Sequence, residues 1–359
     1  MITKTNCIIL VLPLMLVIVA GATRNNHPIN KRNTITYSLN PNVRSSEMFR
    51  ISRDTIHVSI EGSLYSALLI HDKYYAFYHV RDPMSTQPIR KFYIIEKNGK
   101  IEKEIKVPLG ILKDTYPKLY YWHDHVMVNT EFYKSTYFFD PGKSEFVKNP
   151  EIINIPLFED ENCRITSVCH GEWGSQIYFN NKLTGTMQTA NSGCPVVINK
   201  LGDNYFANTS GIPYDDIIEI NDPLKSGTAT TRTIFSCDFT SNFYIPTSFV
   251  SKGVLYHIYN SRNKEFGLNE KKERVIITKD SVKIGIIING VFKPIFTLKD
   301  KFHIELQQQL SPDYQICTFH TEDRLQIGFK KDVPPYKEGK YGLIEISGNE
   351  IKIHYFVSI

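Results

Sequence analysis

Two histidines flank an acidic residue in Trp122-His123-Asp124-His125, and imidazole pairs of this kind can bind a metal ion. Because alternate residues of a strand share a face, His123 and His125 could approach one cation from the same side. No third ligand can be named from the sequence, and an exposed turn explains the same residues. We therefore predict no metal and no cofactor.

Two other clusters could line a pocket or carry a nucleophile. The stretch from His170 to Trp173 combines an indole with a carboxylate, which suits sugar binding, but the adjacent Cys169 favours a structural turn. Cys194 lies in SGCPVV, without a G-x-S-x-G motif or an identifiable base, so we expect it to be bridged rather than catalytic. No phosphate-binding glycine loop is present.

Short amphipathic strands separated by turns must position these residues. The first set covers 63–70, 74–80, 89–96 and 101–108, and Asn98-Gly99 is the strongest two-residue hairpin signal in it. Four up-and-down strands in this length are typical of one propeller blade. With 12% aromatic residues, the composition also favours pleated, half-buried surfaces.

The pattern recurs along the chain at 118–150, from Tyr244 to 288 and at 313–359, with degenerate copies at 164–181 and 194–210. A single four-stranded sheet leaves both apolar faces wet, whereas sheets stacked around an axis cover one another. We predict an all-β fold, a single β-propeller of about six four-stranded blades. A β-sandwich is the alternative. The best helix candidate is 299–310, and its sequence is almost equally compatible with a strand followed by a loop.

The N-terminal residues resemble a secretory signal. A short positive opening precedes the apolar stretch from Cys7 to Ala22, which ends in an A-x-A cleavage pattern. We predict a signal peptide over 1–22, a flexible N-terminal arm over 23–45 and the propeller domain over 46–359. The mature chain is expected to be secreted and extracellular, with no membrane span.

Cysteines and one sequon fit an oxidising compartment. Five cysteines remain after the signal: Cys163, Cys169, Cys194, Cys237 and Cys317. They permit two disulfides and one leftover thiol, with a local link expected between 163 and 237. The sequon at Asn208 predicts glycosylation on a surface loop.

The charge balance excludes a strongly basic protein. The formal net charge is +5 over 359 residues, and the densest basic patch is KKER at 271–274. A solvated loop explains that patch better than a nucleic-acid or heparin site does. We predict no nucleic-acid partner.

The stretch MFRIS at 48–52 resembles the F-R-I-P motif near the mature N-terminus of sialidases and trans-sialidases, which are six-bladed propellers. The resemblance implies that Arg50 is the first carboxylate-binding arginine, and that Arg81 and Asp82 are the second arginine and the acid. Guanidinium forks bind a carboxylate, and a nearby acid protonates the leaving oxygen. The chain departs from that family at Ser52 and in having no S-x-D-x-G-x-T-W box.

These observations favour a secreted binding protein that engages an extracellular protein or glycan through its loops. Loops on a rigid scaffold often carry function. The candidate loops are the one that follows Arg81, the one at 261–274 and the one at 333–340. A sialidase-like glycoside hydrolase, active or degenerate, is the alternative. A structural or surface-coat protein is the third possibility.

Overall fold

The computed structural model describes residues 49–80, 89–114, 117–130, 134–151, 153–169, 175–210, 214–227, 229–238, 243–268, 274–298, 303–311, 314–320 and 341–359. They belong to one compact unit. Their regular structure consists of 25 strands and two short helices, α2 (Leu109–Leu112) and α3 (Pro223–Ser226). The predicted all-β class is confirmed. No helix among these residues is long and apolar enough to cross a membrane.

Six sheets form six blades, and the four blade strands of each pair antiparallel in sequence order; one further strand pairs parallel with the last blade. Blade 1 consists of β2 (Gly62–Ile70), β3 (Lys73–Val80), β4 (Ile89–Glu96) and β5 (Ile101–Ile105). Blade 2 consists of β6 (Lys118–Trp122), β7 (His125–Thr130), β8 (Ser135–Asp140) and β9 (Glu145–Lys148). Blade 3 consists of β10 (Phe158–Glu159), β11 (Cys163–Cys169), β12 (Ser175–Asn181) and β13 (Met187–Ser192).

The second half of the chain repeats the arrangement. Blade 4 consists of β14 (Cys194–Leu201), β15 (Asn204–Ser210), β16 (Tyr214–Asn221) and β17 (Thr231–Asp238). Blade 5 consists of β18 (Phe243–Ser251), β19 (Val254–Leu268), β20 (Arg274–Ile288) and β21 (Val291–Leu298). Blade 6 consists of β22 (His303–Ser311), β23 (Tyr314–His320), β24 (Tyr341–Ser347) and β25 (Glu350–Ser358), with β1 (Arg50–Val58) as a fifth strand.

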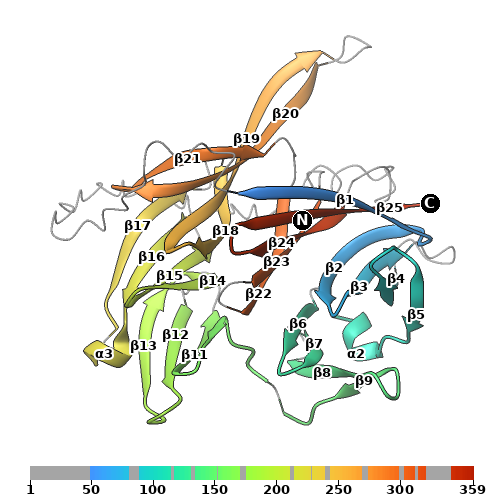
Figure 1. Ribbon diagram of the computed structural model, residues 1–359, viewed down its shortest axis with the longest axis horizontal. Coiled ribbons are helices and arrows are strands. Elements are labelled where there is room, and N and C mark those ends of the chain that lie inside the picture. Colours follow the sequence, from blue (N-terminus) through green and yellow to red (C-terminus); the bar gives the residue numbers. More distant parts are fainter. Residues whose placement is uncertain are drawn as a thin grey trace, which may run out of the picture. The chain divides into compact units, whose positions relative to one another are not determined.

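The blades form a ring, a six-bladed β-propeller, as predicted (Figure 1). Separate apolar cores join blade 1 to blade 2, blade 3 to blade 4, blade 4 to blade 5 and blade 5 to blade 6. Another core packs Leu343 and Phe356 of blade 6 against Tyr74 and Ile95 of blade 1. Each core covers faces that a lone sheet would leave wet, which is the expected driving force for the ring.

The two ends of the ring differ in the length of their connections. In an antiparallel blade the turns between strands one and two and between strands three and four lie at the same end. These turns include 71–72, 123–124, 202–203, 252–253 and 289–290, so we name this end the short-turn face. At the opposite end, the long-connection face, strands two and three are joined through 81–88, 170–174 and 321–340.

Several predicted strands agree with the structure. The range 89–96 coincides with β4, and 63–70 and 74–80 agree with β2 and β3 within a residue. Gly99 of the predicted hairpin turn has φ 92°, and an added Cβ would lie 2.0 Å from the His57 carbonyl oxygen of β1. Only glycine fits this turn beneath the outer strand.

The range 299–310, for which helix and strand both stayed open, contains β22 from His303 onward. Two expectations were wrong. The last repeat does not begin at 313, because β22 (His303–Ser311) is the innermost strand of blade 6 and pairs with β23. The expected loop at 261–274 instead continues β19 through Leu268, and β20 begins at Arg274.

Candidate functional site

Arg50 lies at the outer edge of the ring. It begins β1, which is the outermost strand of blade 6, four strand spacings or about 19 Å from the innermost strand β22. Its side chain is 81% exposed and lies 3.8 Å from Glu350. This position does not fit a carboxylate-binding arginine at the centre of a propeller. Arg81 and Asp82 lie outside the described residues.

The histidine pair lies in an exposed turn. His123 and Asp124 form the two-residue turn between β6 and β7, and His125 begins β7. Among the described residues, no three His, Cys, Asp or Glu side chains gather closely enough to hold a metal ion. The cluster at 170–173 lies outside the described residues.

One disulfide, between Cys169 and Cys194, links β11 of blade 3 to β14 of blade 4. Cys194 is therefore bridged, as expected. The five cysteines permitted two disulfides; among the described residues one forms, and Cys163, Cys237 and Cys317 are buried and not disulfide-bonded. Burial raises the pKa of Cys163 to about 11 and that of Cys317 to about 12, so neither thiol is an activated nucleophile.

Asn208 does not lie on a surface loop, so that expectation was wrong. It lies within β15, is 2% exposed, and its Nδ2 donates a hydrogen bond to the Ile245 carbonyl at 3.2 Å. Its Oδ1 accepts a hydrogen bond from Ser248 Oγ. A glycan on this nitrogen would displace buried contacts, and glycosylation stays a prediction that the burial opposes.

The same amide belongs to a buried polar seam between blades 4, 5 and 6. Asn199 Nδ2 donates to the Ser248 carbonyl at 3.1 Å, and Gln315 Nε2 donates to Asn199 Oδ1 at 3.1 Å. These residues are at most 2% exposed. Because each amide has a partner, the seam fixes the relative position of three blades rather than offering groups to a ligand.

An exposed cluster of aromatic and charged side chains lies at the seam between blades 2 and 3 on the short-turn face. Trp122 ends β6, and its indole Nε1 donates to Glu159 Oε2 at 3.0 Å. The Arg164 guanidinium lies over the Trp122 ring, 4.8 Å from its centre. We name this cluster the Trp122 surface; its residues are Tyr121, Trp122, His123, Glu159, Arg164, Lys182 and Leu183.

Glu159 is the centre of the Trp122 surface. Besides Trp122, Lys182 Nζ donates to Glu159 Oε1 at 3.1 Å, and His123 Nε2 lies 3.9 Å from Oε2. Burial alone would raise the pKa of this carboxyl, but the hydrogen bonds from Trp122 and Lys182 lower it overall. Glu159 therefore stays a carboxylate near neutral pH and positions its neighbours rather than donating a proton.

The rim of this surface contains backbone in the left-handed region. His123 and Asp124 have φ of 47° and 60°, and the equivalent turn of blade 1, His71-Asp72, has φ of 48° and 60°. Such turns normally take Asn-Gly, because other side chains are strained there. Lys252 and Asn289 take the same conformation in the turns of blade 5, so the positive φ reflects the tight two-residue hairpin rather than a function.

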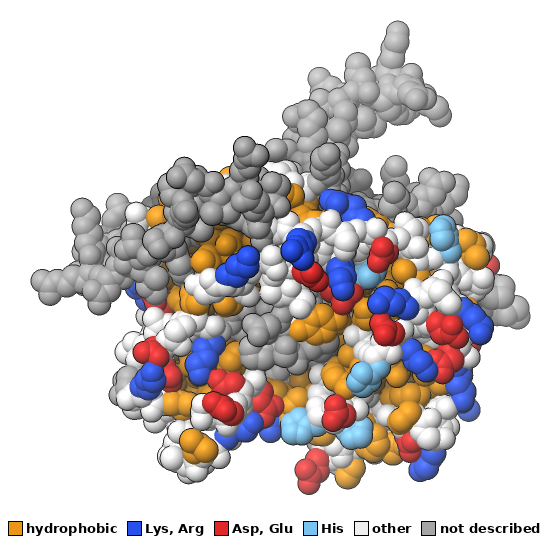
Figure 2. All heavy atoms as spheres, viewed as in Figure 1, with side chains coloured by type: hydrophobic (Ala, Val, Ile, Leu, Met, Phe, Trp, Pro, Cys, Tyr) orange, Lys and Arg blue, Asp and Glu red, His pale blue; other side chains and the backbone are white. Residues whose placement is uncertain are grey.

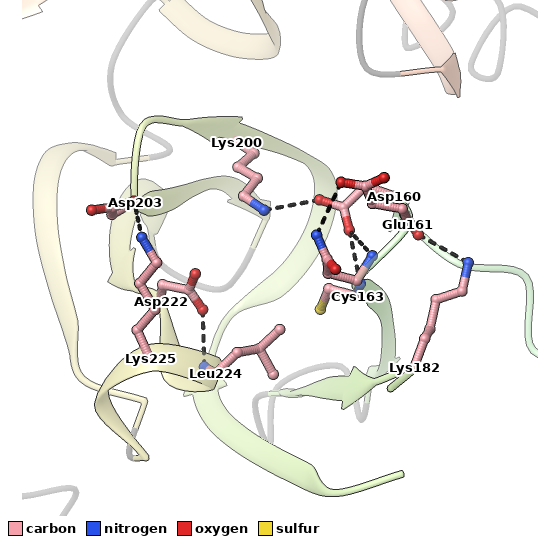
Figure 3. A network of polar contacts seen from close by, with 10 residues as sticks. Asp160, Glu161, Cys163, Lys182, Lys200, Asp203, Asp222, Leu224 and Lys225 are labelled. Carbon is pink, nitrogen blue, oxygen red and sulfur yellow. Dashed lines mark hydrogen bonds and ion pairs between the residues drawn. The ribbon is translucent and has the colours of Figure 1, made fainter. Parts of the chain in front are cut away.

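A second polar network lies beside the surface, between blades 3 and 4 (Figure 3). Lys200 Nζ donates to Asp160 Oδ2 at 2.9 Å, and Asp160 Oδ1 accepts from the backbone N–H of Cys163 at 2.7 Å. Burial raises the pKa of Asp160, but these donors lower it overall. Asp222 accepts from the Leu224 N–H and so caps α3. This network is internally paired and supports the fold.

A buried histidine lies where the ring closes. His354 of β25 is 1% exposed, and its Nε2 lies 2.5 Å from Glu345 Oε1. Its Nδ1 lies 3.3 Å from the Tyr74 hydroxyl of blade 1 and 3.5 Å from Asp54 Oδ2 of β1. Burial would raise the pKa of Glu345, but hydrogen bonds from His354 and Tyr314 lower it. The cluster joins blade 6 to blade 1 and to the N-terminal strand.

Sequence reasoning singled out His123 but missed Glu159, Arg164 and Lys182. They come from three different positions in blade 3 and meet Trp122 only through the packing of neighbouring blades. The repeated His-Asp turn was the one signal available, since it follows the innermost strand in blades 1 and 2.

No protein family matches the sequence, and no curated protein is similar to it. Similar solved structures include the β-propeller domain of the Trilobed protease from Pyrococcus furiosus, at 12% identity and a TM-score of 0.32 over 81% of this chain and 82% of that chain. Kluyveromyces lactis Hsv2 gives 10% identity and a TM-score of 0.29 over 81% and 85%. The Vanderwaltozyma polyspora Nup133 β-propeller domain gives 9% and 0.28 over 80% and 98%. These likenesses assign no function.

Proposed function

We propose that the chain is a secreted β-propeller that binds an extracellular macromolecule, and that the Trp122 surface makes the contact. The apolar stretch from Cys7 to Ala22 supports export. The disulfide between Cys169 and Cys194 supports an oxidising compartment, because such bonds persist mainly outside the cytosol.

The observation that carries the proposal is the composition and exposure of the Trp122 surface. Trp122 and Tyr121 are only half-buried, and Leu183 beside them is 77% exposed. Trp, Tyr and Arg dominate the energetics of protein interfaces when they cluster with a polar rim. The surface offers apolar anchors together with the charged groups of Arg164 and Lys182.

A protein partner fits this arrangement better than a glycan. Sugar rings stack on an open aromatic face, whereas the Arg164 guanidinium already lies over the Trp122 ring. On the face shown in Figure 2, acidic and basic side chains are interspersed rather than segregated. A partner surface of mixed charge would complement such a pattern.

The predicted binding loops form a second part of the proposal. The connections 81–88 and 321–340, and the connection that follows β19, all join strands two and three of their blades. They therefore leave and enter their blades at the long-connection face, in the neighbouring blades 5, 6 and 1. The loops themselves lie largely outside the described residues, and their role stays a prediction.

A photo-crosslinking amino acid tests the surface directly. It is placed at His123 and, as a matched control, at Lys252, which is exposed and has φ 49° at the first position of the equivalent turn in blade 5. After irradiation in extracellular fluid from the source, we expect a protein adduct from position 123 and none from position 252. Trp122→Ala and Arg164→Ala should abolish that adduct.

Equal labelling at both positions, or labelling that survives these substitutions, would exclude the Trp122 surface as the contact. Export is tested separately. Expressed with its own N-terminus in eukaryotic cells, the protein should reach the medium with Thr23 as its first residue. Retention inside the cell, with residues 1–22 still attached, would contradict secretion and leave the crosslinking result to be judged by itself.

A further inference from the structure

Strands β19 and β20 of blade 5 extend beyond the two strands that flank them, β18 and β21. β18 pairs with β19 as far as Ser261, and β21 pairs with β20 from Val282 onward. Beyond these points β19 and β20 pair only with each other, from Arg262↔Asp280 to Leu268↔Arg274 (Figure 1). We name residues 262–268 and 274–280 the ribbon. At about 3.4 Å per residue, its seven pairs extend about 24 Å.

Both outer edges of the ribbon carry backbone N–H and C=O groups that no described strand pairs. Two-stranded hairpins are marginal on their own, and natural proteins often protect open edges with proline. The outer strand β21 of the same blade contains Pro294, whereas the ribbon strand RVIITKD at 274–280 contains no proline and a β-prone centre. This edge is therefore suited to accept an additional strand.

We infer that the additional strand is β20 of a second copy of this chain, antiparallel and centred on Ile277. This register places Arg274 opposite the partner's Asp280, and by symmetry Asp280 opposite the partner's Arg274. The interface uses the same residues on both copies, as in the two-fold dimers that are commonest among oligomers. It joins two ribbons into one four-stranded sheet.

Neighbouring registers lack this complementarity. Registers that keep the same edge of β20 toward the partner differ by two residues, because a one-residue slip turns every side chain to the other face of the sheet. One neighbouring register places Arg274 opposite the partner's Thr278, and the other places Asp280 opposite the partner's Ile276. Of the three registers, only the centred one sets unlike charges against each other at both ends. This self-complementarity is why a second copy, rather than an unrelated strand, is the partner.

Charge reversal tests the register and the symmetry together. The wild-type protein should show a concentration-dependent doubling of mass by size exclusion with light scattering. Arg274→Asp alone and Asp280→Arg alone should each weaken the dimer by about tenfold or more, because two attractive pairs become repulsive. An equimolar mixture of the two variants should dimerise again, since the reversed charges then face each other across the axis.

The matched control is Lys293→Asp on the exposed outer strand β21 of the same blade, which should leave the dimer intact. Unchanged thermal melting would show that all three variants remain folded. The inference would be overturned if the wild-type protein stays monomeric up to about 100 μM, because its dimer would then be weaker than ordinary dimers. Single variants that dimerise like wild type, or a mixture that does not recover, would overturn it too.

Discussion

Buried His257 should make the folded protein sensitive to acid. It lies in β19, is 1% exposed, and its Nδ1 has no hydrogen-bond partner among the described residues. Burial lowers its pKa from the ordinary 6.5 to about 3, because the charged imidazolium is disfavoured away from water. The folded state therefore keeps His257 neutral over the range in which an unfolded chain binds the proton.

The sign and size of the effect follow from this difference. Because the folded pKa lies below the unfolded one, stability is fully present above pH 6.5 and is lost as the pH falls toward 3. Each pH unit in that window costs about 1.4 kcal/mol. Between pH 7.5 and pH 5, His257 should remove about 2 kcal/mol from the free energy of unfolding.

Urea unfolding of the wild type and of His257→Gln at both pH values measures this quantity. The variant should lose about 2 kcal/mol less than the wild type between the two pH values, whatever its absolute stability. His71→Gln, in an exposed turn, serves as the control and should lose as much as the wild type. If His257→Gln and the wild type lose the same amount, His257 is not held neutral and the reasoning from burial is refuted.

Two further predictions concern the turns and the disulfide. Replacing His123-Asp124 with Asn-Gly should raise the free energy of unfolding by about 1 kcal/mol, because both residues have positive φ; an unchanged or lower value in urea titration would show that the turn is not strained. Replacing Cys169 and Cys194 with serine should lower the free energy of unfolding by about 3 kcal/mol, because the disulfide links residues 25 positions apart. Reductant should lower the free energy of unfolding of the wild type by a similar amount and leave that of the serine variant unchanged. No loss in either test would contradict this prediction.

Local signals sufficed where a strand and its turn are neighbours in sequence. The predicted range 89–96 agrees with β4 because its β-prone run ends just before the Asn98-Gly99 turn signal. The six repeats were recoverable for the same reason, since each blade is built from consecutive hairpins. Ring formation then follows from the apolar character of both sheet faces.

Predictions failed where tertiary pairing decides between local options. KDKFHIELQQQL left helix and strand both open, and its residues from His303 form a strand because they pair with β23. The polar composition after Ser261 suggested a loop, whereas cross-strand pairing continues β19 to Leu268. Arg50 matched a sequence motif, but the motif carried no information about which edge of a blade it would occupy.

The candidate site was beyond sequence reasoning for a related reason. Arg164 contacts Trp122 across 42 positions of the chain, through the seam between two blades. That distance depends on how blade 3 packs beside blade 2, which the local sequence around either residue does not specify. Single residues such as His123 can be nominated from sequence, but their partners cannot.

The N-terminal strand β1 is not needed to complete a blade. Blade 6 already has four strands from the C-terminal part of the chain, so β1 adds a parallel fifth strand rather than completing the blade. The ring is therefore closed by packing between blades 6 and 1, chiefly the apolar core around Tyr74 and Leu343. His354 adds polar links from this interface to Glu345 and Asp54. β1 also covers part of this interface, because its Ile56 and Val58 are buried in the same core. Its loss should therefore expose apolar surface of blades 6 and 1 and lower the free energy of unfolding.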